Sequence, residues 1–125
     1  MELTRIQQTA FGDPDGNCLE ACFASLTGIP LDEIPHFLNE GWFGSYCRWF
    51  IERGWELDYW TGGIEAAPDG YAIASGPANR GLDHSVIYHG TEFFHDPHPS
   101  GDGLESISDW MTLTKKEAGD GFRDS

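Results

Sequence analysis

The apolar and polar residues follow one pattern in the first half of the chain and another in the second. Turn-forming residues and glycines divide the first half into three segments of helical character, and we expect helices over 18–27, 31–38 and 42–53. Gly28 and Gly54 directly follow two of these segments, as glycine commonly does where a helix ends.

From residue 55 onward the chain consists of short runs rich in aromatic and β-branched residues, which is typical of strands. We expect strands over 55–60, 71–74, 85–89, 92–95 and 110–114, and a short first strand over 3–7. Helices followed by strands predict an α+β domain, in which N-terminal helices pack on one face of a C-terminal antiparallel β-sheet.

The length of 125 residues fits one domain, which we place at 1–114, followed by a polar tail over 115–125 that we expect to be frayed. A domain of this size can bury a core without disulfides or metals. No apolar run approaches the roughly 20 residues of a membrane span, and no apolar stretch follows the first five residues. We therefore expect no membrane segment, no signal peptide and a cytoplasmic location.

Acidic residues outnumber basic ones by 21 to 7, which gives a formal net charge of −14. Nucleic acids and anionic membranes are bound mainly through Lys and Arg, so neither is an expected partner. Such a charge keeps a protein soluble, and it also suits a basic protein partner. The sequence leaves both interpretations open, and it does not indicate an oligomeric state.

The three cysteines, Cys18, Cys22 and Cys47, are not expected to form a disulfide framework, because their number is odd and the expected compartment is reducing. The sequence has no Cys-x-x-Cys pair and no His-x-x-x-His spacing, so we expect no metal and no cofactor. Histidines do gather near Asp96, but neighbouring positions in a strand point to opposite faces. We interpret Cys22 and Cys47 as core residues.

Cys18 stands at the start of the first predicted helix, directly after a turn-rich loop over 11–16. Asn17 is expected to cap that helix. A helix N-terminus carries partial positive charge, which favours the thiolate that a cysteine nucleophile needs. The alternative is that Cys18 is a small buried core residue, and its position alone does not decide between the two.

A second candidate group lies where two predicted strands flank a turn around Gly90. If Gly90 is the centre of the turn, cross-strand partners have numbers that sum to 180, and His84 lies opposite Asp96. Directly opposed residues are close enough for an imidazole–carboxylate hydrogen bond. A shift of half a position would place His95 or Pro97 opposite instead.

This register also predicts how the side chains are arranged. His84 and Asp96 would share the face of the sheet that looks toward the start of the helix carrying Cys18. That face would also hold Val86, Tyr88, Glu92 and Phe94, and the opposite face would hold His89 and His95. A cysteine on a helix and a His–Asp pair on a sheet together supply the three roles that a cysteine hydrolase requires.

Three short features resemble the papain-like cysteine peptidase superfamily: the Gly-Asn-Cys segment that ends at Cys18, a strand that bears His84, and Asp96 at the end of the next strand. The resemblance is closer to compact bacterial and phage members, such as bacteriocin-processing peptidase domains, and covers roughly residues 8–104. It implies a papain-like fold, with Cys18 as the nucleophile, His84 as the base and Asp96 as the acid that orients the base.

Members of that superfamily usually carry a glutamine shortly before the nucleophile, which helps the backbone N–H of the cysteine to form the oxyanion hole. Gln7 and Gln8 are the candidates here, and we take Gln8 as the oxyanion residue. Gln8 precedes Cys18 by ten residues, a longer gap than the superfamily usually shows, so the turn-rich loop would have to absorb the difference.

Two functions are compatible with this pattern. The first is a thiol-dependent hydrolase, a cysteine peptidase or amidase that cleaves a peptide, isopeptide or amide bond in a protein or peptide substrate. A transferase that passes the acyl group to an amine would use the same residues. The second is a catalytically inactive binding or inhibitor protein with the same fold, which in a phage-encoded protein would act on a host protein in the host cytoplasm.

Overall fold

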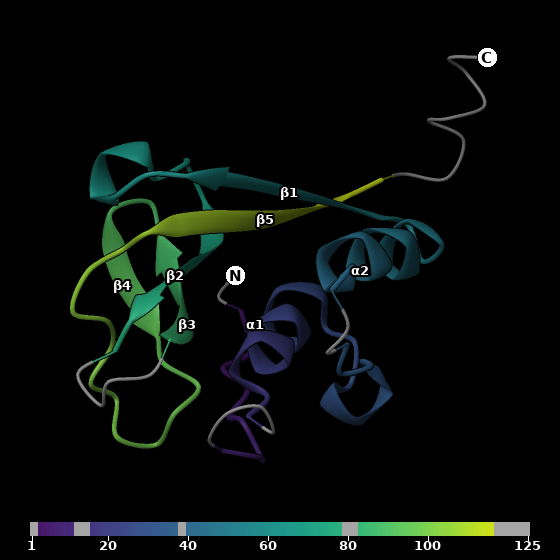
Figure 1. The fold of residues 1–125 in the computed structure, drawn as a ribbon, viewed down its shortest axis with the longest axis horizontal. Coiled ribbons are helices and arrows are strands. Elements are labelled where there is room, and N and C mark those ends of the chain that lie inside the picture. Colours follow the sequence, from purple (N-terminus) through teal and green to yellow (C-terminus); the bar gives the residue numbers. More distant parts are fainter. Residues whose placement is uncertain (1–2, 12–15, 38–39, 79–82, 117–125) are drawn as a thin grey trace.

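The computed structural model describes residues 3–11, 16–37, 40–78 and 83–116. Within these residues two α-helices come first and a five-stranded antiparallel sheet follows, which confirms the predicted α+β class (Figure 1). The helices are α1 (Cys18–Thr27) and α2 (Trp42–Ile51), and the short 3₁₀ helices are η1 (Leu31–Glu33) and η2 (Ile64–Ala66). The strands are β1 (Trp55–Thr61), β2 (Tyr71–Pro77), β3 (Asp83–His89), β4 (Glu92–His95) and β5 (Asp109–Lys115). Among the described residues, no helix has the length and apolar character that crossing a membrane requires.

Helix α1 begins and ends where the sequence predicts. At its C-terminal end, Gly28 adopts a left-handed conformation with φ of 78°, and its N–H donates to the carbonyl of Ala24. At the other end, Asn17 makes no capping hydrogen bond through its side chain. The Asn17 Oδ1 atom instead accepts the backbone N–H groups of Thr9 and Ala10, both at 2.9 Å. Asn17 therefore occupies the predicted N-cap position, but its side chain binds the incoming segment instead of the helix.

The N-terminal segment over 3–8 belongs to no strand, contrary to prediction. Some of its backbone polar groups bind side chains instead of a neighbouring strand. The N–H of Ile6 donates to Oγ of Ser25 in α1 at 3.0 Å, and the carbonyl of Ile6 contacts Nε2 of His95 at 2.7 Å. The segment thereby ties α1 to the end of β4.

The second and third predicted helices are shorter than expected. The helix predicted over 31–38 is reduced to η1, because Pro35 disfavours a helical conformation for the preceding residue, and Ile34 is extended with φ of −87° and ψ of 122°. The third predicted helix ends at Ile51, and Gly54 follows in a turn with φ of 88°.

Parts of three predictions lie outside the described residues: 12–15 in the predicted loop, 38 in the second predicted helix and 117–125 in the predicted tail. The tail begins later than predicted, since Lys115 belongs to β5 and the N–H of Lys116 donates to the carbonyl of Gly54 at 2.7 Å. The folded part therefore extends past residue 114.

The last of the described strands lies inside the sheet, between β1 and β2. The strand order is β1-β5-β2-β3-β4, and β5 pairs antiparallel with both β1 and β2. The chain reaches this position along the end of β2, where the N–H of Ser108 donates to the carbonyl of Ser75 at 2.8 Å. Gly76 permits the close approach, because a Cβ atom there would lie 2.3 Å from the carbonyl oxygen of Ser106.

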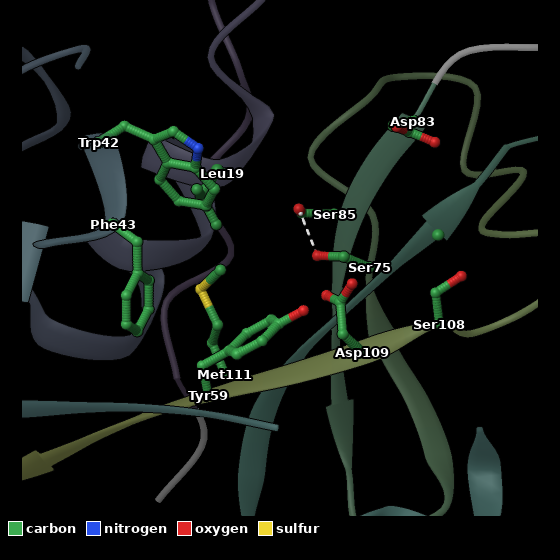
Figure 2. A pocket seen from close by; sticks show the side chains of 11 residues that line it. Leu19, Trp42, Phe43, Tyr59, Ser75, Asp83, Ser85, Ser108, Asp109 and Met111 are labelled. Carbon is green, nitrogen blue, oxygen red and sulfur yellow. Dashed lines mark hydrogen bonds between the residues drawn. The ribbon is translucent and has the colours of Figure 1, made fainter. Parts of the chain in front are cut away.

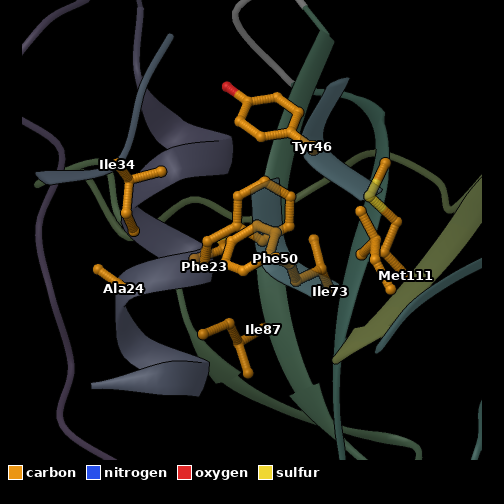
Figure 3. Packing of buried hydrophobic residues seen from close by; sticks show 10 residues of the cluster. Phe23, Ala24, Ile34, Tyr46, Phe50, Ile73, Ile87 and Met111 are labelled. Atoms are coloured by element: carbon orange, nitrogen blue, oxygen red, sulfur yellow. The ribbon is translucent and has the colours of Figure 1, made fainter. Parts of the chain in front are cut away.

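The main core lies between the helices and one face of the sheet (Figure 3). Phe23 of α1 and Phe50 of α2 pack with Ile73 and Ile87 of the sheet, and all four side chains are buried. On the opposite face, a smaller cluster around the buried Trp110 is covered by residues of η2 and of the segment before β5. The two faces of the sheet thus have separate apolar layers, and the α-helices α1 and α2 cover only the face with the main core.

Candidate active site

A buried histidine–carboxylate pair lies at the sheet edge, where β3 begins and β4 ends. Nε2 of His84 is 2.6 Å from Oδ1 of Asp96, and the two residues are only 5% and 4% exposed. The Asp96 carboxylate accepts two further hydrogen bonds from the backbone N–H groups of His98 and Gly103, at 2.9 and 2.8 Å. Three donors therefore hold this carboxylate in one orientation.

The pair forms as predicted, but the strand register that led to the prediction is wrong. The ladder pairs Ile87 with His95 and Tyr88 with Phe93, because the turn contains two residues, Gly90 and Thr91, and β4 has a bulge. Asp96 lies beyond the end of this ladder. The loop after β4 therefore brings its carboxylate to His84, where the prediction had placed the two residues directly opposite each other.

The predicted faces of the strands are also wrong. Val86 and Tyr88 pack in the cluster around Trp110, on the side of the sheet away from the main core. Phe94, which was expected on their face, packs against the main core instead, because the bulge interrupts the alternation in β4. The expectation that His95 points away from α1 fails as well, since its ring contacts the segment that leads to α1.

On the opposite face, His89 was expected to point away from α1. Its ring stacks on Tyr71, with the ring centroids 4.3 Å apart, and Tyr71 packs against the main core. Glu92, predicted to share the face of His84, is exposed at the start of β4. The assignments of Glu92 and Phe94 depended on the register of 180, and the observed ladder pairs Glu92 with His89 instead of Tyr88.

Cys18, the first residue of α1, is the third member of the group. It is a free, partly buried thiol, and its interaction with His84 contributes to the raised pKa of that imidazole. Because Asp96 occupies Nε2 of the imidazole, Nδ1 is the ring nitrogen left for the thiol. The structure thus brings together the three residues that the sequence indicated, from a helix, a strand and a loop.

The electrostatics of the group favour an ion pair at neutral pH. Burial lowers the pKa of His84, but hydrogen bonds to Asp96 and Cys18 outweigh this effect and raise it to about 9. Burial raises the pKa of Asp96, but hydrogen bonds from His84, Gly103 and His98 outweigh burial and lower it to about 2. At neutral pH the pair is therefore an imidazolium and a carboxylate.

Gln8 is held between the start of α1 and the loop after Asp96, despite its distance from Cys18 in the sequence. Its backbone N–H donates to the carbonyl of Pro97 at 3.0 Å. Its Nε2 atom donates to the carbonyl of Ala10 at 2.8 Å, and the same carbonyl accepts the backbone N–H of Asn17. Gln7 is exposed, so of the two candidates only Gln8 has a buried position beside the site.

The side chain of Gln8 has one unsatisfied group. Its Oε1 atom is buried and has no hydrogen-bond partner among the described residues. Asn17 fixes the segment that carries Gln8, through the hydrogen bonds that replace the predicted cap. Sequence reasoning missed this role of Asn17 because nothing local distinguishes a capping Asn from one that binds a segment eight residues earlier.

Sequence reasoning also missed the two backbone N–H groups that donate to Asp96, those of His98 and Gly103, although the sequence does carry a signal for the first. An Asp side chain that accepts the N–H two residues later forms an Asx-turn, and the Asp-Pro-His sequence ending at His98 is compatible with that turn. The donor at Gly103 had no local signal, because it depends on how the whole loop folds back.

The other two cysteines differ from Cys18. Cys22 is completely buried in the main core, as predicted, and burial raises its pKa well above the usual value. Cys47 is partly buried and packs against the same core, and burial also raises its pKa. In the described part of the chain, no three His, Cys, Asp or Glu side chains are grouped so that they could hold a metal ion.

A cavity of about 510 Å³ is lined by residues that neighbour Cys18 and His84 in the chain. Leu19, which follows Cys18 in α1, and Asp83, which precedes His84 in β3, both line it. Since consecutive Cα atoms are about 3.8 Å apart, the backbone of Cys18 and of His84 lies next to residues that line the cavity.

Comparisons of the chain with family models, with curated proteins and with solved structures find no match. The papain-like resemblance of the sequence is therefore still a prediction, and function has to be inferred from the geometry of the site.

Proposed function

We propose that this protein is a papain-like, thiol-dependent hydrolase that cleaves a peptide, isopeptide or amide bond in a protein or peptide. The proposal depends on one observation, the buried hydrogen-bonded pair of His84 and Asp96 with the thiol of Cys18 interacting with the imidazole. Nucleophilic catalysis by cysteine needs a thiol, a base that takes its proton and a group that orients the base. These residues have the chemistry and the contacts for all three roles.

In the proposed reaction, the proton of the Cys18 thiol resides on His84 before the attack, and Asp96 stabilises the resulting imidazolium, which is the form of His84 at neutral pH. The sulfur attacks the carbonyl carbon, and the C–N bond breaks while His84 donates its proton to the leaving amine. Water then gives a proton to His84 and attacks the thioester, which releases the carboxylic acid and restores the thiol. An amine in place of this water would make the protein a transferase.

The carbonyl oxygen becomes negatively charged during the attack and requires N–H donors. The backbone N–H of Cys18 is one proposed donor, because the first N–H groups of a helix have no partner within the helix. Gln8 is the other, since Nε2 carries two hydrogens and the carbonyl of Ala10 accepts one of them. The proposed setting is the reducing cytoplasm, where free thiols persist.

Electrophile labelling tests this proposal. Cys18 and Cys47 are both partly exposed, so Cys47 is an internal reference for access to reagent. With iodoacetamide or a peptide vinyl sulfone at pH 7, we expect Cys18 to react at least about tenfold faster than Cys47. The substitution His84→Ala should remove the difference, and peptide mapping by mass spectrometry measures both rates.

Equally slow labelling of the two thiols would contradict the proposed hydrolase. That result would favour the inactive binding protein, in which the same three residues have only a structural role.

A further inference from the structure

The cavity beside Cys18 has two chemically different walls (Figure 2). The helices supply an apolar wall of Leu19, Trp42 and Phe43, and Met111 lies between the walls. Trp42 is 36% exposed although it is a large apolar side chain, so this wall is open to a ligand. The sheet side supplies a polar wall, whose side chains are Ser75, Asp83, Ser85, Ser108 and Asp109.

Two carboxylates dominate the polar wall. Burial, and then the negative charge of Asp83, raise the pKa of Asp109, while a hydrogen bond from Tyr59 lowers it. Among the described residues that line the cavity there is no Lys, Arg or His to balance these charges. A cation placed against this wall would relieve the repulsion between the two carboxylates.

A pair of hydroxyl groups extends the polar wall. Oγ of Ser75 and Oγ of Ser85 are 2.8 Å apart, and Ser85 is only 7% exposed. One hydroxyl donates to the other, so the pair retains lone pairs that can accept hydrogen bonds from a ligand. The polar wall therefore combines negative charge with hydrogen-bond acceptors, which suits a group that carries several N–H donors.

We propose that this cavity binds the side chain of a lysine or arginine residue of the substrate, within two residues of the bond that Cys18 attacks. This inference depends on the proposed function for the identity of the ligand as part of a substrate. The occupant is indicated by charge complementarity, since the cavity pairs an apolar wall with two carboxylates.

The chemistry of a basic side chain matches both walls. Its aliphatic stem packs against Leu19 and Met111, and its charged head lies between Asp83 and Asp109. Trp42 adds an aromatic face that attracts a cation. An acidic side chain would be repelled, and an apolar one would leave both carboxylates without a counter-charge. The net charge of −14 also steers basic substrates toward the protein.

A binding measurement on the Cys18→Ala protein tests the inference without turnover. The probes are acetyl-Ala-Lys-Ala-Ala-amide and its norleucine counterpart, which lacks only the ammonium group. The chain has two methionines, and Met111 lines the cavity, so methyl-labelled methionine gives an NMR signal at the site and one reference signal from Met1. We expect the Met111 signal to shift at a lysine-peptide concentration about tenfold or more below that needed with norleucine.

The carboxylates are tested by the double substitution Asp83→Asn and Asp109→Asn in the same protein. This change should reduce the preference for lysine to about twofold or less. The matched control is Glu92→Gln, because Glu92 is an exposed acid of β4 outside the cavity. The control should retain the preference, which separates a local contact from the overall charge. Equal binding of both peptides by the parent protein, or an unchanged preference in a folded double variant, would overturn the inference.

Turnover by the wild-type protein separates this inference from the proposed function. Peptides with lysine, arginine, norleucine or glutamate at the two positions on each side of the bond are compared by kcat/KM. A preference for the basic peptides supports both proposals. Turnover without that preference overturns the binding inference alone. Binding selectivity without turnover of any peptide upholds the cavity as a basic side-chain site and overturns the hydrolase.

Discussion

Two histidine–carboxylate pairs lie near helix α1, and they look alike but differ in what surrounds them. In the first pair, His84 lies 2.6 Å from Asp96, next to the thiol of Cys18. In the second, Nδ1 of His36 lies 2.5 Å from the carboxylate of Glu20, which is on α1 itself. Asp96 and Glu20 are equally buried, at 4% exposed. The distances and the burial of the carboxylates would therefore assign the two pairs the same role, although the side chain of His36 is 33% exposed and that of His84 only 3%.

The difference lies in the third partner. The Glu20 carboxylate accepts a hydrogen bond from the hydroxyl of Tyr46 in α2, and the oxygen of the same hydroxyl lies 2.9 Å from the carbonyl oxygen of Pro35. Burial and the hydrogen bond to Glu20 raise the pKa of Tyr46, so its hydroxyl stays protonated. These contacts connect α1 to α2, and the described contacts include no nucleophile. The comparison teaches that a His–carboxylate pair becomes a candidate for catalysis only where a reactive group lies within its reach.

The largest expected effect comes from removing that reactive group. The substitution Cys18→Ser should lower kcat/KM by about 10⁵-fold or more, because the poorly nucleophilic hydroxyl replaces the thiolate. The control Cys47→Ser changes another partly exposed thiol and should leave the rate within about twofold. Thermal unfolding should be nearly unchanged by Cys18→Ser. Full activity in the Cys18→Ser protein would exclude the mechanism.

The matched amide substitutions in the two pairs should affect different properties. Asp96→Asn should reduce kcat by about 10²- to 10⁴-fold with the fold preserved, because the amide no longer stabilises the imidazolium or fixes its tautomer. Glu20→Gln should leave kcat within about twofold and lower the free energy of unfolding by about 1–3 kcal/mol. Steady-state kinetics and urea unfolding on both variants measure these effects. If Glu20→Gln reduced kcat as strongly as Asp96→Asn, the proposed contrast between the pairs would be wrong.

Removing the third partner of the second pair should affect stability alone. Tyr46→Phe deletes the hydroxyl that binds Glu20 and Pro35 and keeps the ring in the core, where it packs against Phe23. We expect a loss of about 1–3 kcal/mol in the free energy of unfolding, because a buried carboxylate loses a donor. Labelling of Cys18 by iodoacetamide should keep its rate. A fall in that rate comparable to the fall in His84→Ala would show that the two pairs are coupled.

The smallest expected effect is a dependence of stability on pH, which arises from the His84–Asp96 pair. The folded state raises the pKa of His84 from 6.5 to about 9. The contribution of His84 to the free energy of unfolding is therefore complete below pH 6.5 and is lost as the pH rises through 9. The folded state lowers the pKa of Asp96 from 3.8 to about 2, so its contribution is complete above pH 3.8 and is lost as the pH falls through 2. Both contributions are therefore present between about pH 4 and 6.5.

Urea unfolding at pH 5.5 and 9.5 checks this window. The cost of Asp96→Asn should be larger at pH 5.5 than at pH 9.5, because His84 is charged only at the lower pH. The control is Ile87→Val, a buried core substitution without a titrating group, whose cost of about 1 kcal/mol should be the same at both values. Equal costs of Asp96→Asn at the two pH values would show that the imidazolium–carboxylate pair does not stabilise the fold.

Local chemistry explains what could be predicted about the fold. The bounds of α1 follow from the loop before it and from Gly28, whose left-handed conformation ends the helix. The positions of the strands follow from their composition, although β1, β2, β3 and β5 are longer than the runs that indicated them. The strand expected over 3–7 failed because its backbone groups bind Ser25 and His95, and no local pattern reports such distant partners.

The sequence by itself determined the components of the site, and tertiary structure decided how they meet. Cys18 stands at a helix start for local reasons, but its contact with His84 required α1 to pack beside β3. The pairing of His84 with Asp96 was predicted from a register that does not occur, and the contact exists because a bulge and a returning loop redirect the chain. The insertion of β5 between β1 and β2 likewise has no local signal. Backbone conformation depends on neighbouring residues, whereas strand order, cavities and buried charge pairs depend on contacts between residues far apart in the chain, which a single sequence does not display.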